Sequence, residues 1–587
     1  MSEPGFASGR GALGTTTMAT IATEAGPTPS PAPSRPFGGW AAVALALAGY
    51  LLAMLMLFRG AILSGFDLGF GNRGDALIEI SLLEHWRSVL MGAASWNQPL
   101  YFHPYADTLG YNDGYLLSGL IYSGWRTVFD PFLADTLTAF TWRSIGYVAT
   151  LWLVRGVLRW GWGPAILIAI LATIANNMFL QAGHAQINSL ALLPLLAGLA
   201  ILAVRSEIAR RPHAHLFAVM AAGLIGLWLV TAFYFAWFTF YFTLVFALCW
   251  LATTGRLRGS ALLALLRAHW RLLATFMGAT GIAALAFLAV YLPKRIETGG
   301  HGYMVSYLTQ PWDVVNVGEY NWLWGWIARA IRAVAEGLSP PGGYLRRAFL
   351  GWEHHSGFPL LLFGLICVAG YRLIRWGEDP LVRAFALAVV ISWALTLRIW
   401  QISPWMLVYY LVPAASGVRV VLRYQLFLAL PVLLLVGLAW RDSLARLWQR
   451  RPWLASGLVA LLIVEQANGW HMTELSRREQ SAAFGAIPAP PSGCTSFYVV
   501  AARVNEPPFG DADYHAHYAH NVDAMFLAER WRLPTLNGYS TFNPPDWNFA
   551  YPLAADYDAR VAAYARTHRL TGLCRLDMRA ASPWRRL

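Results

Sequence analysis

Long apolar runs recur between Trp40 and Val464, and they constrain the fold of this chain more than any other feature. A helix needs about 20 mostly apolar residues to cross a bilayer. Only 13% of the residues are charged, whereas an ordinary soluble protein carries roughly 25%. The sequence therefore predicts a mostly α, polytopic membrane bundle of roughly 11 to 13 segments.

The arginines indicate how the bundle is oriented, because short cytoplasmic loops are enriched in Lys and Arg. Five groups of arginines between apolar runs can all be cytoplasmic at once. They are Arg155 and Arg159; Arg205, Arg210 and Arg211; Arg256, Arg258, Arg267 and Arg271; Arg372, Arg375 and Arg383; and Arg441, Arg446, Arg450 and Arg451. This choice places two large loops outside, residues 63–113 and 293–356, together with the chain after about residue 466.

One apolar stretch disturbs this assignment. Residues 114–130 and 133–154 both look apolar, yet only an odd number of crossings fits between the first external loop and Arg155. Either 114–130, which contains Ser118, Ser123 and Gly124, is a re-entrant or interfacial hairpin, or a later segment is shorter than its apolar run.

The two ends of the chain differ from the membrane domain at 39–466. Residues 1–38 are rich in Thr, Pro, Ser, Ala and Gly, which predicts a disordered cytoplasmic tail. Residues 467–587 contain a proline-rich linker and short β-like runs such as 496–500, which predict a small α/β extracytoplasmic domain. Cys494 and Cys574 could form a disulfide in an exported domain.

The net charge of +13 would suggest a nucleic-acid partner in a soluble protein. Here the arginines lie in short loops between apolar runs, so the charge reflects membrane topology. We therefore expect membrane lipids as partners and no nucleic acid.

An acidic stretch follows the first apolar run. If residues 74–86 form a helix, Asp75, Glu79, Leu82 and Trp86 share one face, and Glu84 and His85 lie beside it. Carboxylates that lose solvation next to a membrane are typical of acid/base chemistry. A polar helix lying in the headgroup region is the alternative interpretation.

Other polar segments lie on the same predicted side. His103 belongs to a long loop rich in aromatic residues and prolines, which either lines a site or forms an interfacial cap. His184 and Gln186 lie at a helix boundary, where a histidine is often only satisfied by local hydrogen bonds.

Four basic residues run against the positive-inside trend. Lys294 and Arg295 follow one apolar run, and Arg419 and Arg423 precede another with a spacing of four. Guanidinium groups bind phosphate oxygens in a bidentate way, so these residues are candidates for a lipid phosphate. Snorkelling, or pairing with an acid such as Glu297, is the alternative.

A run of acids and histidines between Asp511 and Asp523 has the composition of a metal site. Its spacing matches no fixed ligand pattern, which favours surface or interface histidines. The sequence contains no phosphate-binding glycine loop and no serine-hydrolase or zinc-protease motif.

Several of these segments together resemble bacterial members of the GT-C glycosyltransferase superfamily, near the YfhO-like proteins. The resemblance covers residues 40 to 550. Its motifs are Gly74-Asp75, Gly183-His184-x-Gln186 with Leu193-Pro194, Arg419-x-x-x-Arg423, and Asn537-Gly538-Tyr539-Ser540-x-Phe542-x-Pro544-Pro545.

The resemblance implies an enzyme of the bacterial cytoplasmic membrane that transfers a hexosyl or pentosyl group from a polyprenyl-phosphate carrier on the outer face. It also implies that Asp75 lies at the catalytic centre. The Asp-x-Asp or Glu-Asp pairs of some relatives are absent, so the use of a divalent cation stays open, and no cofactor is assigned.

Charge then suggests the roles. A carboxylate such as Asp75 can take the proton of an acceptor hydroxyl, and the basic residues can stabilise the leaving lipid phosphate, with inversion at the anomeric carbon. Glu79, Glu84, His85, His103, His184 and Gln186 are candidates to assist. Two other functions fit the same residues: a transporter or flippase of lipid-linked saccharides, and a glycan polymerase or ligase.

Overall fold

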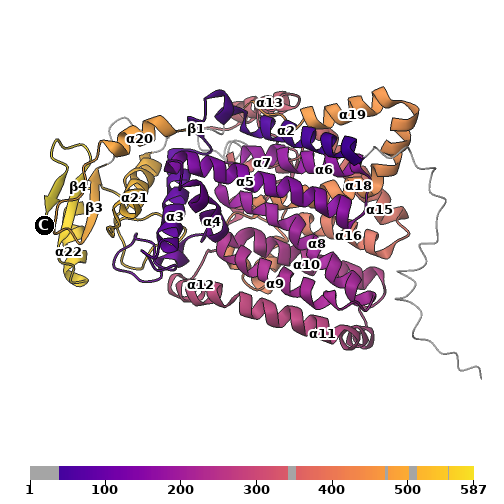
Figure 1. The fold of residues 1–587 in the computed structure, drawn as a ribbon, viewed down its shortest axis with the longest axis horizontal. Helices are drawn as coiled ribbons and strands as arrows, with labels where there is room; N and C mark the ends of the chain where they lie inside the picture. The colour runs from indigo at the N-terminus through magenta and orange to yellow at the C-terminus, as the bar shows by residue number, and fades with distance from the viewer. Residues whose placement is uncertain (1–38, 341–351, 470–473, 502–511, 553) are drawn as a thin grey trace, which may run out of the picture.

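A computed structural model describes residues 39–340, 352–469, 474–552 without 502–511, and 554–587. The predicted tail at 1–38 therefore lies outside the described residues. Most of the described chain is a bundle of long helices that run side by side, as Figure 1 shows. These helices are α2 (Gly39–Leu63), α5 (Pro131–Leu151), α6 (Trp162–Ile174), α7 (Asn176–Leu180), α8 (Leu192–Ile208), α9 (His213–Thr231), α10 (Phe233–Thr253), α11 (Gly259–Ala283), α12 (Leu285–Thr298), α15 (Leu360–Trp376), α16 (Pro380–Ala394), α18 (Tyr424–Arg450) and α19 (Pro452–Val464).

Six helices of the described chain are long and apolar enough to cross a membrane. The count rises to seven if α11 and α12, which meet at a 58° bend, are taken as one span. Even with the shorter apolar helices α16 and α19, the described residues give at most nine such segments, fewer than the roughly 11 to 13 that the sequence predicts. The chain is a multi-pass membrane protein with a mostly α fold, as the sequence predicts.

The stretch at 114–130 does not form a spanning helix. It contains α4 (Leu116–Trp125), whose ten residues extend only about 15 Å, half the thickness of the hydrocarbon core. The next helix, α5, begins at Pro131, with Asp130 accepting hydrogen bonds from the backbone N–H groups of Phe132 and Leu133. Because α4 is too short to span, residues 114–130 add no crossing between the first loop and Arg155, as the re-entrant or interfacial alternative requires.

A small α/β domain at the C-terminus lies at one end of the bundle (Figure 1). Its sheet has the order β3-β4-β5, with β3 and β4 parallel and β5 antiparallel to β4. Cys494 and Cys574 form a disulfide with an S–S length of 2.01 Å, which joins the segment before β3 to β4. Its elements are α20 (Arg477–Gly485), β3 (Ser496–Ala501), α21 (Ala512–Trp531), α22 (Tyr557–Thr567), β4 (Leu573–Asp577) and β5 (Trp584–Arg586).

The bundle and this domain are joined at what we call the domain end of the bundle. β1 (Leu68–Gly69), which follows α2, pairs antiparallel with β2 (Leu475–Ser476), which follows α19. Helix α3 (Arg73–Leu90) packs between the bundle and α21, and Figure 1 shows it at this junction. Two further short helices, α13 (Gly325–Leu338) and α17 (Trp405–Leu411), belong to the loops of the bundle.

Candidate functional site

The first turn of α3 presents Asp75 at the domain end. The side chain of Asn72 caps the helix by accepting hydrogen bonds from the N–H groups of Gly74 at 2.9 Å and Asp75 at 3.3 Å. The rest of the predicted face is buried, including Glu79 and Trp86. The side chain of Asp75 remains 32% exposed, so its carboxylate is within reach of a substrate.

Asp75 belongs to a cluster of four charged or polar side chains from four distant segments. Nδ1 of His184 lies 3.3 Å from Oδ2 of Asp75, and Nε2 of His184 lies 3.4 Å from Oε1 of Glu353. A terminal nitrogen of Arg423 lies 2.8 Å from His184 Nε2 and 2.8 Å from Glu353 Oε1. We call Asp75, His184, Glu353 and Arg423 the acid–base cluster.

The geometry lets His184 serve in two protonation states. When neutral, Nδ1–H donates to Asp75 and Nε2 accepts from Arg423. When protonated, Nε2–H instead faces Glu353. Burial and Arg423 lower the pKa of His184, but Glu353 and Asp75 outweigh them and raise it above its ordinary value. The ring can therefore take up a proton beside Asp75.

The carboxylate of Glu353 stays ionised although it is largely buried. Burial alone would raise the pKa of its carboxyl, but Arg423 and His184 hold that pKa well below its usual range. Arg423 also contacts Glu353 through its Nε at 3.4 Å, so the guanidinium is held in a fork against the carboxylate. This pair positions His184 and, through it, Asp75.

Two further carboxyls lie near the cluster. Burial, together with the charges of Asp135 and Asp75, raises the pKa of Glu79 well above its ordinary value. Burial raises the pKa of Asp113 to about 6, against the opposing effects of a hydrogen bond from the Phe233 N–H and the charge of Arg423. Both carboxyls therefore hold a proton to a higher pH than an exposed carboxyl does, so less negative charge gathers around Asp75.

Gln186 is connected to the loop of Asp113 through the side chain of Tyr115. Its Oε1 accepts a hydrogen bond from the Tyr115 hydroxyl at 3.1 Å, and Tyr115 lies two residues after Asp113. Gln186 thus helps to hold the loop that carries Asp113. It makes no contact with Asp75 among those found for the described residues.

Arg295 and Arg419 form a second group, which we call the cation pair. Both charges act on His301, whose pKa is lowered to about 4 by burial, then by Arg419 and Arg295. Arg295 donates to the Ser416 hydroxyl at 2.9 Å, and Arg419 lies over the ring of Tyr307. Within the described residues neither arginine is paired with a carboxylate, which is unusual for two cations so placed.

The other two basic candidates have acidic partners. Lys294 lies 2.9 Å from Glu297, which also accepts from the Tyr111 hydroxyl at 2.7 Å. Lys294 therefore pairs with Glu297, which was one of the alternatives that the sequence left open. Arg423 is held by Glu353 in the acid–base cluster. The cation pair, and not Lys294, is therefore available for a phosphate.

Three of the assisting candidates lie elsewhere. Glu84 and His85 follow Asp75 by nine and ten residues, about 14 Å along α3. Glu84 accepts from Arg126 at 2.5 Å and from the Tyr122 hydroxyl at 2.6 Å, and His85 faces the Trp96 carbonyl at 3.0 Å. His103 contacts the C-terminal domain through its backbone N–H and carbonyl. The contacts that these three residues make within the described chain stabilise the fold and do not reach Asp75.

The motif at 537–542 joins the C-terminal domain to the first loop. Asn537 accepts from the Phe102 N–H through its carbonyl and from the Val499 N–H through its side chain. Gly538 packs so closely on the Phe102 ring that a Cβ there would overlap it. Asn112 donates to the Tyr539 carbonyl at 3.3 Å, and Ser540 donates to the Phe542 carbonyl. Phe542 then stacks on His301, with ring centroids 4.5 Å apart, so the motif ends beside the cation pair.

The acid–base cluster does not have the arrangement of a divalent-cation site. No three His, Cys, Asp or Glu side chains of the described chain converge in the way a metal ion requires. The guanidinium of Arg423, a cation, contacts both Glu353 and His184 at 2.8 Å.

The histidine-rich run of the C-terminal domain is described only in part, since the side chains of 511–519 lie outside the described residues. His520 is buried and faces the Phe549 carbonyl at 3.0 Å. Asp523 is buried and forms an ion pair with Arg73. Both described members therefore stabilise the fold from its interior.

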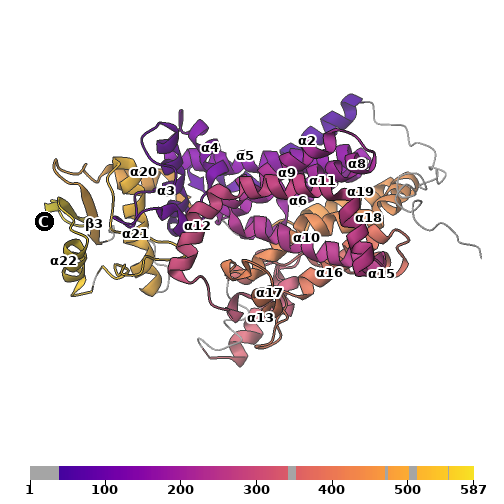
Figure 2. The same ribbon diagram turned by 90° about the horizontal axis from the view of Figure 1, so that it is seen from below.

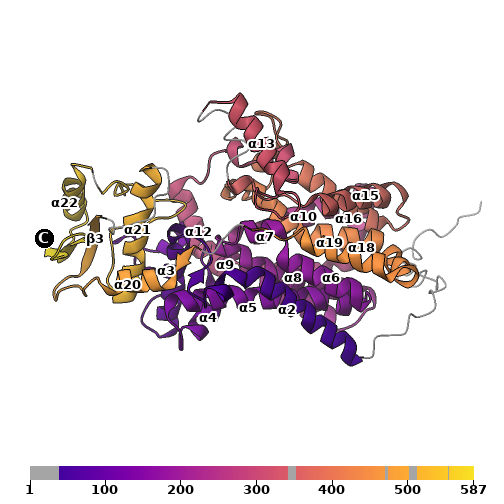
Figure 3. The ribbon, with the colours of Figure 1, turned by 90° about the horizontal axis from the view of Figure 1, so that it is seen from above.

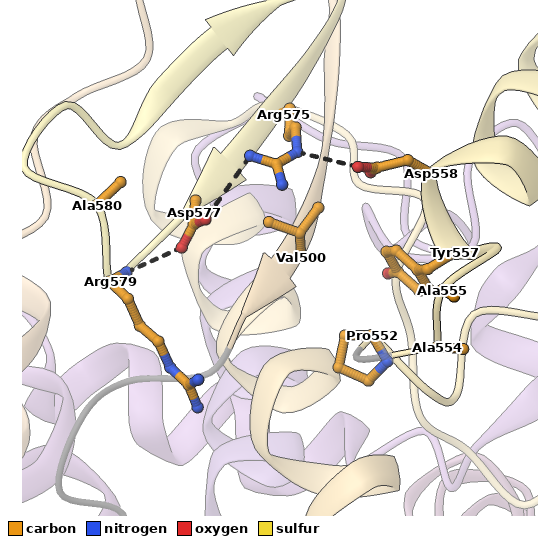
Figure 4. A pocket seen from close by; sticks show the side chains of 10 residues that line it. All are labelled: Val500, Pro552, Ala554, Ala555, Tyr557, Asp558, Arg575, Asp577, Arg579 and Ala580. Atoms are coloured by element: carbon orange, nitrogen blue, oxygen red, sulfur yellow. Dashed lines mark hydrogen bonds and ion pairs between the residues drawn. The ribbon is translucent and has the colours of Figure 1, made fainter.

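A separate cavity of about 460 Å³ opens in the C-terminal domain, as Figure 4 shows. Three of its charged side chains are paired with one another: Nε of Arg575 lies 3.5 Å from Asp558, and a terminal nitrogen lies 3.7 Å from Asp577. The acid–base cluster is a stronger candidate for chemistry because its imidazole can change protonation state beside an exposed carboxylate.

A buried carboxyl at the junction of α3 and α21 gives a testable pH effect. Burial raises the pKa of Glu529 to about 8, so the folded protein keeps a proton that the unfolded chain releases near pH 4.5. Stability from this group is complete below pH 4.5 and is lost as the pH rises to 8. Glu529→Gln is therefore expected to gain thermal stability over the wild type as the pH rises from 5 to 8, by roughly 3 kcal/mol.

Thermal unfolding of the detergent-solubilised protein at several pH values measures this effect. Glu479→Gln is the matched control because Glu479 is exposed. A pH dependence that is the same in the wild type and Glu529→Gln would contradict the buried, protonated state.

Sequence reasoning missed two residues of the site. Glu353 lies at the end of the second large loop, next to the apolar run of α15. The sequence could have indicated Glu353, because it is an acid on the same predicted side of the membrane as Arg423, and Arg423 needs a counter-charge. Asp113 ends the first large loop and belongs to none of the motifs described above.

Comparison with known proteins finds similarity only at the level of structure. No protein-family model and no curated protein matches the sequence. The structure is similar to the oligosaccharyltransferase AglB of Archaeoglobus fulgidus in complex with an inhibitory peptide and a dolichol-phosphate, with a TM-score of 0.48 and 11% identity over 92% of this chain and 70% of that one. It is similar to the apo form of an Archaeoglobus fulgidus oligosaccharyltransferase, with a TM-score of 0.44 and 14% identity over 86% of this chain and 65% of that one.

It is also similar to ArnT of Cupriavidus metallidurans bound to undecaprenyl phosphate, with a TM-score of 0.41 and 13% identity over 85% of each chain. The resemblance to the GT-C superfamily rests on the sequence motifs, and the narrower likeness to YfhO-like proteins stays a prediction. At these identities and TM-scores the similarity does not assign a function to any residue. The roles of residues are therefore inferred from the contacts within the acid–base cluster.

Proposed function

We propose that this protein is a glycosyltransferase that moves a sugar from a polyprenyl-phosphate donor to an acceptor hydroxyl, with Asp75 as the base. The observation that carries the proposal is the contact of His184 with Asp75 and Arg423. These three residues belong to three sequence motifs that lie more than 100 residues apart.

Asp75 supplies the base. Its exposed carboxylate takes the proton of the acceptor hydroxyl as the oxygen attacks the anomeric carbon. His184 fixes the orientation of the carboxylate and shares the incoming proton, because Glu353 accepts from its Nε2–H once the ring is charged. A single displacement of this kind inverts the anomeric carbon.

The cation pair supplies the site for the leaving group. The bond that breaks joins the anomeric carbon to the lipid phosphate, which departs with an added negative charge. Arg295 and Arg419 carry charges that no described carboxylate neutralises. Both charges lower the pKa of His301, which keeps its ring neutral. Replacement of either arginine by Gln should therefore weaken use of the donor more than use of the acceptor.

A panel of polyprenyl-phosphate sugars incubated with the purified protein in detergent or nanodiscs tests the function. We expect loss of sugar from one donor, with an inverted product when a suitable acceptor is present. No turnover of any donor, together with movement of a labelled lipid-linked saccharide across proteoliposomes, would instead favour the transporter that the sequence left open. Turnover only of long lipid-linked glycans would favour a polymerase or ligase.

We place the acid–base cluster on the outer face of a bacterial cytoplasmic membrane, with the N-terminus inside. The support is the arginine distribution, the short α4, which adds no crossing between the first loop and Arg155, and the disulfide of the C-terminal domain, which fits an oxidising compartment. An impermeant maleimide applied to intact cells is expected to label Cys494 and Cys574 only after reduction. Absence of labelling after reduction would contradict this orientation, and a Cys494→Ser/Cys574→Ser protein gives the background.

A further inference from the structure

Helix α13 exposes an apolar stripe although it is too short to span a membrane. Trp326, Ala330, Val334 and Leu338 follow one another at intervals of four and line one side of the helix. Trp326 is 58% exposed, Val334 59% and Leu338 72%. The fourteen residues of α13 extend only about 21 Å, below the length of a spanning helix.

The polar residues of α13 lie on another side. Arg332 forms an ion pair with Glu319, and Arg329 donates to the Glu319 carbonyl. The small residues Ala328 and Ala335 face the protein. The helix therefore has a small face against the protein, a charged edge and a broad apolar face that no described residue covers.

The position of α13 relates it to the membrane. The Trp324 indole donates to Glu465 at 3.1 Å, and the Asn321 side chain donates to the Glu465 carbonyl at 2.8 Å. Glu465 directly follows α19. Figures 2 and 3 show α13 standing out from the side of the bundle near its domain end. The helix is therefore attached at the level where an apolar helix of the bundle ends.

Helix α17 repeats this pattern between α16 and α18. Leu407 is 58% exposed, Tyr410 71% and Leu411 75%, while Trp405 and Val408 are buried against the protein. Two apolar side chains before the helix are even more exposed, Trp400 at 76% and Ile402 at 79%. A soluble surface rarely exposes a group of large apolar side chains of this extent.

We propose that α13 and α17 are interfacial helices whose exposed apolar faces lie in the lipid of the outer leaflet at the domain end. An amphipathic helix at the membrane surface buries its apolar face at the boundary of headgroups and acyl chains, and Trp and Tyr are enriched there. Lipid is the occupant because both helices are attached to the ends of bundle helices, where the bilayer surface has to be.

The proposal adds a role for the two loops. The loop that contains α13 also carries Glu353 of the acid–base cluster. The segment that follows α17 carries Ser416 and Arg419, and the Tyr409 hydroxyl of α17 donates to the His301 carbonyl at 2.7 Å. Membrane-seated helices thus flank the cation pair, so a phosphate borne by a lipid would reach it sideways from the leaflet.

Spin labels in the full-length protein test the proposal without any activity assay. Cys249 and Cys367 are replaced by Ala and the disulfide is kept, and a single Cys is introduced as Ala330→Cys, Val334→Cys or Leu407→Cys. Glu336→Cys on the charged edge of α13 is the matched control. In nanodiscs of phosphatidylethanolamine and phosphatidylglycerol, the accessibility of each nitroxide to oxygen is compared with that to a water-soluble nickel complex.

We expect the ratio of oxygen to nickel accessibility to be several-fold higher at the three apolar positions than at Glu336→Cys. A ratio equal to that of the control would overturn the proposal, because the apolar faces would lie in water. Low accessibility to both reagents would also overturn it, because a second copy or another protein segment would cover the faces. Neither result bears on whether the protein transfers a sugar.

Discussion

Asp75→Asn is expected to lower the rate of sugar transfer by about 10²- to 10⁴-fold, the usual contribution of a general base. The amide has nearly the shape of the carboxylate and still accepts from His184, so the acid–base cluster keeps its geometry. It cannot take the acceptor proton. The measurement is the turnover of whichever donor the panel identifies, with the amount of monodisperse protein and its unfolding temperature determined alongside.

Asp107→Asn is the matched control, because Asp107 belongs to the same loop as Asp113 and accepts from Asn97 through one oxygen. Its left-handed backbone conformation suits Asn as well as Asp. This variant should remain active. Full activity of Asp75→Asn would remove Asp75 from its proposed role, whatever the donor proves to be.

Asp523→Leu is expected to cost roughly 3–5 kcal/mol of stability, because it leaves the Arg73 guanidinium buried without its carboxylate. Both side chains of this ion pair are enclosed, with Arg73 5% exposed and Asp523 fully buried. Arg73 lies two residues before Asp75, so transfer should fall together with stability. Thermal unfolding and donor turnover of the same preparation measure the two effects.

The double variant Arg73→Met/Asp523→Leu separates the charge from the contact. Two apolar side chains can replace a buried ion pair with little loss, so this protein should recover most of the stability. Asp556→Asn is the surface control, since Asp556 is 68% exposed beside Arg560 and should change stability by less than about 1 kcal/mol. An Asp523→Leu protein as stable as the wild type would mean that the ion pair does not hold α3.

Much of the fold follows from the sequence because hydropathy and local periodicity are local properties. The apolar runs predicted a mostly α membrane bundle, and the β-like run at 496–500 predicted a strand in a small α/β domain; both are confirmed. The number of segments was less certain, since an apolar run does not reveal where its helix ends. Residues 114–130 look apolar, and the sequence left open whether they span the membrane; the helix there has only ten residues.

The site could be predicted only in part because ion pairs are tertiary. Asp75, His184 and Arg423 were selected separately, and the structure brings them together. The spacing of Arg419 and Arg423 suggested one phosphate clamp, yet Arg423 is held by Glu353 and Arg419 lies near Arg295 instead. Pairings of this kind join residues tens to hundreds of positions apart, and no local pattern records them.

The docking of α3 on α21 also sets an order in time. The partner of Arg73 lies 450 residues further along the chain, so at about 5–20 residues per second a ribosome makes it more than about 20 s later. Until then α3 carries charged side chains beside the membrane without the helix that encloses them. The four residues of the acid–base cluster are thus all made before α21, the helix that fixes the first turn of α3 through Arg73.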